Sequence, residues 1–203
     1  MSTSNSVLRP TWAALRMILV LTIVLGIGYT AVVLGIGQGA FTSKANGSLI
    51  TDSSGEVVGS RLIGQSFSTA DGEPDPRYFQ PRPSAAGDGY DALSSSGSNL
   101  GPENSELIAE IRQRRADIAA FNGVSPESVP ADALTASGSG LDPDISPDYA
   151  AIQVERVASA RGLSGADVTD LVAAHTRGRD LGYLGEPAVN VVELNSALDA
   201  MSE

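Results

Sequence analysis

The longest apolar run of the chain lies near its N-terminus. Residues 17–37, MILVLTIVLGIGYTAVVLGIG, contain no charged side chain. A helix rises about 1.5 Å per residue, so this run crosses a hydrocarbon core of about 30 Å. A cleaved signal peptide is the alternative, but its apolar region has only about 7–15 residues, and Gly39-Ala40-Phe41 is a poor cleavage site. The pattern predicts a transmembrane helix, which we place at residues 15–40.

Charges on either side of this segment predict its orientation. Arg9 and Arg16 precede it, and only Lys44 follows it closely. Basic residues near a span favour the cytoplasmic side. We therefore expect residues 1–14 in the cytoplasm and residues 41–203 as one extracytoplasmic domain.

Glycines give the predicted span a shallow face. Gly28, Gly35 and Gly39 lie on it, and Gly35 and Gly39 form a small-xxx-small pair that lets a second helix approach closely. Glycine is also simply common in membrane helices. The two explanations have equal weight, and the first predicts a partner helix.

Beyond the span, strand and helix patterns alternate. Residues 47–67 alternate apolar and polar positions with glycines between, which indicates two or three strands. Residues 68–104 are rich in Gly, Pro, Ser and Asp and form a long loop. Helical spacing follows at 105–122 and 164–175, and 187–198 indicates a short strand, Val189 to Val192, running into a helix. The expected fold is one transmembrane helix followed by a single soluble α+β domain.

The region from Thr135 to Gly162 combines a small loop with a helix. Ser137 to Gly140 alternates serine and glycine, Ser146 is a suitable N-cap ahead of Pro147, and Gly162 suits the helix end. Small apolar residues follow helical spacing between these signals. Three polar residues fall off that stripe: Gln153, Glu155 and Arg156.

Composition narrows the classes of partner. The 203 residues carry a formal net charge of −11 and no cysteine, which excludes disulfides and thiolate metal sites. From Phe41 onward lie all 24 acidic residues and 11 of the 13 basic ones, a net charge of −13. Such a charge opposes binding to nucleic acid or to an anionic surface.

No residue pattern indicates catalysis. His175 is the only histidine, and on an apolar helix face it is expected to be structural. Asp142 and Asp144 flank a proline, where turn and cap roles are favoured over metal binding. A Gly-x-x-x-x-Gly-Lys-Ser/Thr phosphate loop and an Asp-Lys-Thr-Gly motif are both lacking, so we expect no catalytic residue, no metal site and no unaided ATP hydrolysis.

Seven ordered motifs identify a family. Between residues 15 and 199 the chain resembles the KdpC family of the Kdp-type potassium-transporting ATPases. The resemblance rests on GSLI (47–50), SRLIGQSF (60–67), YFQPRPSA (78–85), SGSNLGP (96–102), SGSGLDPDIS with the following helix (137–162), His175-Thr176, and LGEPAVNVVELNSAL (184–198).

The resemblance implies a role in a complex. It implies an accessory, non-enzymatic subunit in the inner membrane of a prokaryote, with ion-translocating, ATP-hydrolysing and small accessory subunits as partners and potassium as the transported ion. The family is described as a catalytic chaperone that raises the ATP affinity of the ATP-hydrolysing subunit in a transient ternary complex. It also implies an ordered 68–104 loop that carries a docking surface: Tyr78, Phe79, Arg82 and Pro83.

The resemblance therefore implies ATP as a ligand, but the predicted membrane topology argues against direct contact between this domain and ATP. A serine-glycine loop ahead of a helix offers backbone N–H groups to an anion. The family-implied nucleotide contacts are Ser137, Gly138, Ser139, Gly140 and Gln153. A domain outside the membrane cannot reach ATP bound in the cytoplasm. The alternative is a structural cap on the outer face of the ion-translocating subunit, without contact to ATP.

Overall fold

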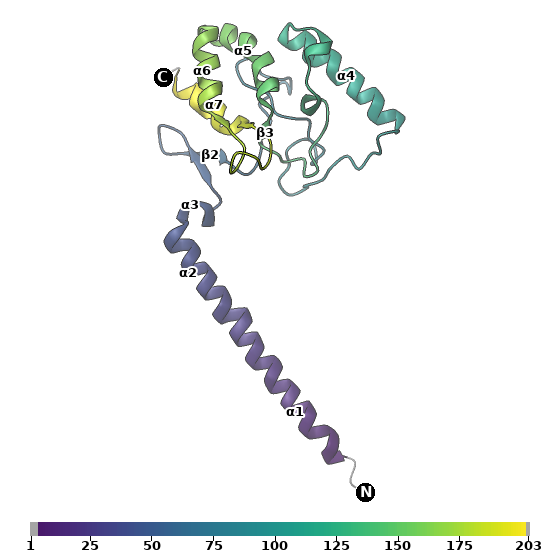
Figure 1. The fold of residues 1–203 in the computed structure, drawn as a ribbon, viewed down its shortest axis with the longest axis vertical. Helices are drawn as coiled ribbons and strands as arrows, with labels where there is room; N and C mark the ends of the chain where they lie inside the picture. Colours follow the sequence, from purple (N-terminus) through teal and green to yellow (C-terminus); the bar gives the residue numbers. More distant parts are fainter. Residues whose placement is uncertain (1–3, 202–203) are drawn as a thin grey trace. The chain divides into compact units, whose positions relative to one another are not determined.

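The computed structural model describes residues 4–201 and divides into two compact units at Ser48 (Figure 1). The described part of the first unit is mostly helical: α1 (Ser4–Leu21), the π-helix η1 (Thr22–Tyr29), α2 (Thr30–Ala40) and the short α3 (Thr42–Ala45). One helix in the described chain, Val7–Ala40, is long and apolar enough to cross a membrane, with a mean hydropathy of 2.5 over its most apolar 18 residues. The helix begins at Ser4, earlier than residue 15, and contains Pro10, which cannot donate a hydrogen bond to the carbonyl four residues before it.

The π-helix changes the spacing of the glycines. Gly35 and Gly39 both lie in α2 and, four residues apart, share a face. Gly28 lies in η1, where the i→i+5 pattern interrupts α-helical spacing. A Cβ atom added at Gly35 or Gly39 meets nothing within 4 Å, so that face of α2 is open within the described structure.

The second unit is the expected mixture of helices and small sheets. A hairpin pairs β1 (Leu49–Thr51) with β2 (Val57–Ser60), and its turn is fixed by Asp52, whose side chain accepts hydrogen bonds from the backbone of Ser54 and Glu56. A three-stranded antiparallel sheet has the order β3 (Asp144–Ile145), β5 (Ala188–Asn190), β4 (Thr176–Arg177). The α+β prediction is confirmed.

Four helices accompany these sheets: α4 (Ser105–Asn122), α5 (Pro147–Arg161), α6 (Gly165–Ala174) and α7 (Val191–Ala200). Two 3₁₀ turns, η2 (Pro126–Ser128) and η3 (Ala131–Ala133), join α4 to β3. The predicted caps are confirmed at α5, where Ser146 accepts from the Tyr149 N–H and Gly162 ends the helix at φ 67°. The last strand ends earlier than predicted, because Asn190 caps α7 by accepting from the Glu193 N–H.

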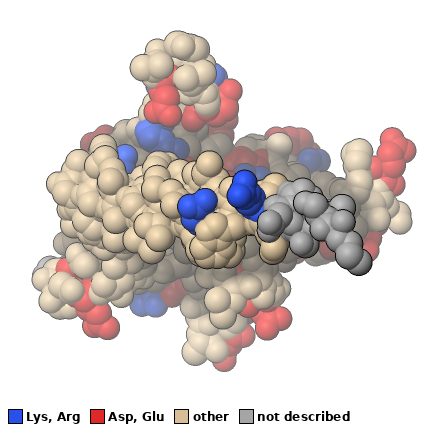
Figure 2. Space-filling view, turned by 90° about the horizontal axis from the view of Figure 1, so that it is seen from below, with Lys and Arg blue, Asp and Glu red and all other residues tan. Residues whose placement is uncertain are grey.

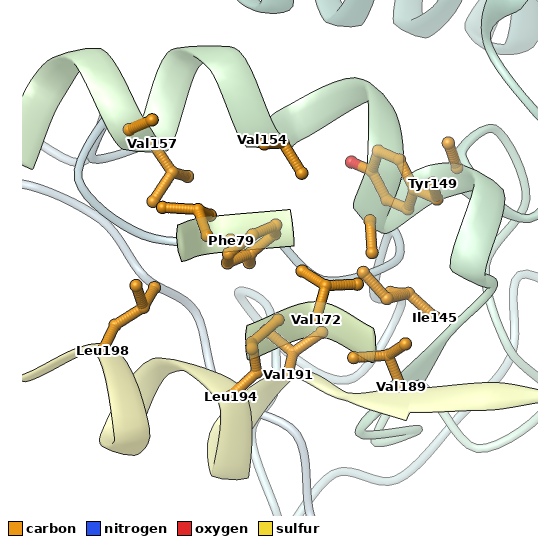
Figure 3. Packing of buried hydrophobic residues seen from close by; sticks show 14 of the residues in the cluster. Phe79, Ile145, Tyr149, Val154, Val157, Val172, Val189, Val191, Leu194 and Leu198 are labelled. Atoms are coloured by element: carbon orange, nitrogen blue, oxygen red, sulfur yellow. The ribbon is translucent and has the colours of Figure 1, made fainter. Parts of the chain in front are cut away.

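The core lies between α5, α7 and the three-stranded sheet (Figure 3). Phe79 enters it from the long loop and lies between Val154 and Val157 on α5 and Leu194 on α7. Phe79 is completely buried. The long loop is thereby part of the domain core, which explains how the 44 residues between β2 and α4 (61–104), without a named helix or strand, remain ordered.

Candidate functional site

The segment that follows Pro76 is held by side-chain amides rather than by a sheet. Asn195 on α7 accepts from the Phe79 N–H and donates to the Phe79 carbonyl, both at 2.9 Å. Gln153 on α5 does the same for the next residue, accepting from the Gln80 N–H at 2.7 Å and donating to its carbonyl at 3.1 Å. We call Gln153 and Asn195 the amide clamp. Both are fully buried, so each pair satisfies backbone groups that water cannot reach.

Arg156 extends the amide clamp along the chain. Its guanidinium donates to the carbonyls of Pro76 and Tyr78, at 2.6 and 3.0 Å, and to Gln153 Oε1 at 2.7 Å. Its Nε donates to Asn122 of α4 at 2.9 Å. The guanidinium also lies 4.4 Å from the centre of the Phe121 ring, within cation–π range.

Burial penalises the charged form of Arg156 and lowers its pKa to about 10. The side chain is still fully charged at neutral pH. One partly buried cation therefore joins α4, α5 and the long loop through neutral acceptors.

These contacts change the interpretation of two predicted residues. Gln153 was expected off the apolar stripe of its helix, as a donor to nucleotide, but it is 0% exposed and bound to Gln80. A nucleotide could reach its amide only if the Gln80 segment moved away. Phe79 was expected on a docking surface, and that assignment is wrong because its ring fills the core. Spacing alone could not show this, because the partners are 73 and 116 residues away.

The other predicted docking residues lie at or near the surface. Tyr78 is partly exposed, with Arg161 4.6 Å from its ring centre and Asp199 3.3 Å from its hydroxyl. Arg82 forms an ion pair with Asp142 at 2.9 Å and donates to the Thr135 carbonyl at 3.2 Å.

A groove runs beside these residues and α4. Its volume is about 590 Å³, and its lining includes Pro81, Arg82, Pro83, Tyr90, Ile118 and Phe121. The Tyr90 hydroxyl donates to the Arg82 carbonyl at 2.8 Å, and burial raises the pKa of this phenol, so it stays protonated. A wall with three prolines and three aromatic rings suits binding of an apolar segment more than proton transfer.

The serine-glycine loop is packed against the 84–97 region. Gly140 has φ 68°, and a Cβ atom there would lie 2.6 Å from the Ser96 carbonyl oxygen. The Gly140 carbonyl accepts from Ser84 Oγ at 2.6 Å, and the Ser139 carbonyl accepts from the Ser96 N–H at 2.9 Å. Gly140 therefore allows the loop backbone to lie close to the backbone of the 84–97 region.

The backbone N–H groups of this loop are partly occupied. Gly140 N donates to Ser137 Oγ at 2.9 Å and Leu141 N donates to Ser139 Oγ at 3.1 Å. The two serines thus occupy N–H groups that an anion would need. Gly138 and Ser139 are exposed at the tip of the loop.

Titratable groups outside the groove have structural partners. His175 ends α6, with Nδ1 2.9 Å from the Leu171 carbonyl oxygen, as expected for a structural histidine. Asp142 accepts from the Asp144 N–H, and Asp144 forms an ion pair with Arg177 at 2.9 Å, which fits their predicted turn roles. Among residues 4–201 no cluster of three potential metal ligands is found. On the face shown in Figure 2, acidic side chains lie at several separate places rather than in one patch.

Comparison with known proteins assigns the chain to a family. The family model described as "K+-transporting ATPase, c chain" matches residues 11–200. A potassium-transporting ATPase KdpC subunit of Kineococcus radiotolerans is 52% identical over 194 residues, covering 96% of this chain and 95% of the relative. The KdpC subunit of Gemmatimonas aurantiaca is 55% identical over 196 residues, covering 96% and 93%. That of Caulobacter vibrioides is 52% identical over 194 residues, covering 95% and 92%.

Proposed function

Because the chain belongs to the KdpC family of K+-transporting ATPase c chains, we propose that it is a membrane-anchored, non-catalytic accessory subunit that such an ATPase needs for assembly and activity. The observation that carries the proposal is the helix Val7–Ala40. It is strongly apolar, and none of its most apolar window is buried within the described structure. A helix of this kind needs lipid and partner helices around it.

The proposed arrangement places the N-terminus in the cytoplasm and the domain from residue 41 onward outside. Arg9 and Arg16 before the span support this orientation. There the domain caps the ion-translocating subunit, and the open Gly35 and Gly39 face of α2 receives a partner helix. The groove beside Arg82 and Pro83 provides a docking surface on the domain.

A role in raising the ATP affinity of the ATP-hydrolysing subunit is the second candidate. The exposed Gly138 and Ser139 favour it, since their backbone could approach a phosphate. This second role requires that the domain lies on the cytoplasmic side and that Gln153 breaks its hydrogen bonds to Gln80. In that case Gln153→Ala would weaken apparent ATP affinity at unchanged assembly, whereas in our proposal it loosens the domain first.

Side-specific labelling tests the orientation. The chain has no cysteine, and Asp88 is exposed, so Asp88→Cys gives a single reactive thiol. On intact cells we expect labelling by a membrane-impermeant thiol reagent. Labelling only after lysis would place the domain in the cytoplasm and favour the ATP role.

Substitution in the span tests assembly. A Cβ atom added at Gly35 meets nothing within 4 Å in the described chain, so Gly35→Leu fills the glycine face without displacing a neighbouring side chain at that atom. We expect reduced co-purification with the other subunits. Gly37→Leu, about 200° around the helix, is the control, where the added Cβ would lie 3.7 Å from the Ala45 Cβ, an ordinary van der Waals contact. Equal co-purification of both variants would remove the glycine face from the proposal.

A further inference from the structure

The loop between β4 and β5 ends in an exposed apolar tip. Three large apolar residues within four consecutive positions are exposed there: Leu181 at 81%, Tyr183 at 69% and Leu184 at 49%. Most other strongly exposed large apolar residues of this unit lie in or beside the β1–β2 hairpin. Leu93, at 97%, stands alone in the long loop. We call residues 181–184 the apolar tip.

The apolar tip is built rather than loose. Asp180 and Leu184 pair in both directions, each N–H donating to the other carbonyl at 2.9 Å. Arg179 braces the base, since it donates to the Gly185 carbonyl at 2.8 Å and forms an ion pair with Glu186. The three-residue turn is thus closed by two backbone hydrogen bonds and by the contacts of the Arg179 side chain.

Backbone strain is concentrated in the same turn. Leu181 has φ 53° and Gly182 has φ 82°. A leucine in the left-handed region is rare, and such strain persists where the surroundings enforce it, often at ligand contacts. In this turn the strained backbone holds the Leu181 side chain in solvent, where the side chain makes little stabilising contact with the rest of the domain.

We propose that the apolar tip is a docking anchor that inserts Leu181 and Tyr183 into an apolar, uncharged pocket on another subunit of the ATPase. This inference rests on the proposed function, since it requires that the chain assembles into such a complex. Side chains on a rigid loop bind at small entropic cost, and tyrosine is enriched among the residues that dominate interface energetics.

The charge of the domain favours a protein pocket over the membrane surface as the partner that binds the apolar tip. The chain from Phe41 onward carries a net charge of −13, and anionic headgroups repel such a domain. Arg179, the cation nearest the tip, is paired with Glu186 and adds little attraction to lipid. An uncharged protein pocket carries no such penalty.

Co-purification of the full chain with its partner subunits tests the anchor. We expect Leu181→Ser with Tyr183→Ser to reduce co-purification about tenfold or more. The control is Leu93→Ser, which removes the most exposed leucine outside the tip and should leave co-purification unchanged. If the wild-type chain co-purifies with the other subunits and the tip variants co-purify equally well, the anchor is overturned but the proposed function is not. Failure of the wild-type chain to co-purify would overturn the proposed function.

A spectroscopic experiment identifies the occupant. Leu181→Cys creates the only thiol of the chain, which is labelled with a polarity-sensitive fluorophore. We expect a blue shift of its emission when the other subunits are present, and none in vesicles of phosphatidylglycerol and phosphatidylethanolamine that contain this chain alone. A blue shift in those vesicles would assign the tip to the bilayer or to a second copy and overturn the proposal. An unshifted emission in the assembled complex would also overturn it.

Discussion

Arg156 is the position where one substitution should loosen the whole candidate site. Its guanidinium donates to the carbonyls of Pro76 and Tyr78, to Gln153 and to Asn122, so it joins the long loop to α4 and α5. Arg156→Met keeps much of the aliphatic stem and removes every one of these donors. We expect the domain to fold with reduced stability and the 76–85 segment to become mobile.

The magnitude follows from the contacts. A hydrogen bond to a charged group contributes about 1.5–3 kcal/mol, but this is offset by the cost of burying the cation, which is reflected in its lowered pKa. Of the four acceptors, Gln153 Oε1 retains the Gln80 N–H and the Tyr78 carbonyl retains Gln80 Nε2. The Pro76 carbonyl and Asn122 Oδ1 lose the donors described here. We expect a loss of about 3–5 kcal/mol.

Urea unfolding of the full chain in mild detergent, followed by circular dichroism, measures this loss. For a domain of this size the loss corresponds to a fall in Tm of roughly 6–20 °C. Arg115→Met is the matched control, because Arg115 is exposed on α4. A loss below about 1 kcal/mol for Arg156→Met would refute the reasoning, since surface arginines also give changes of that size.

Two further predictions concern the loops around the site. Gly140→Ala should destabilise the domain by about 1–3 kcal/mol, because φ is 68° and the added Cβ would lie 2.6 Å from the Ser96 oxygen; Gly138→Ala, which meets nothing within 4 Å, should leave the urea midpoint unchanged. Equal midpoints for both variants would contradict the close-approach role. Hydrogen bonds from Arg77 lower the pKa of the nearly buried Asp75 below 3.8, so its stabilisation is present above that pH and is lost as pH falls through the lowered value. Asp75→Asn should therefore flatten the decline of unfolding free energy in acid, and an unchanged acid profile would count against the assignment.

Local signals in the sequence determined the elements. Ser146, Pro147 and Gly162 limit α5 to within a residue, because caps act on backbone groups only a few positions away. The apolar run at 17–37 required a long helix, since such a segment satisfies its backbone only internally. The ordered motifs were also sufficient to indicate the family, which the family match confirms.

Tertiary structure alone decided what the polar residues of those elements do. From the sequence, a glutamine and an arginine off an apolar stripe are expected in solvent, yet Gln153 is buried and Arg156 is partly buried. The backbone carbonyls that accept from these two side chains lie in a loop more than 70 residues earlier, without a repeating pattern. Phe79 resembles an exposed loop aromatic for the same reason. Burial in this domain depends on long-range pairing through side-chain amides, which no local spacing encodes, because the amide clamp forms only when α5 and α7 meet across the core.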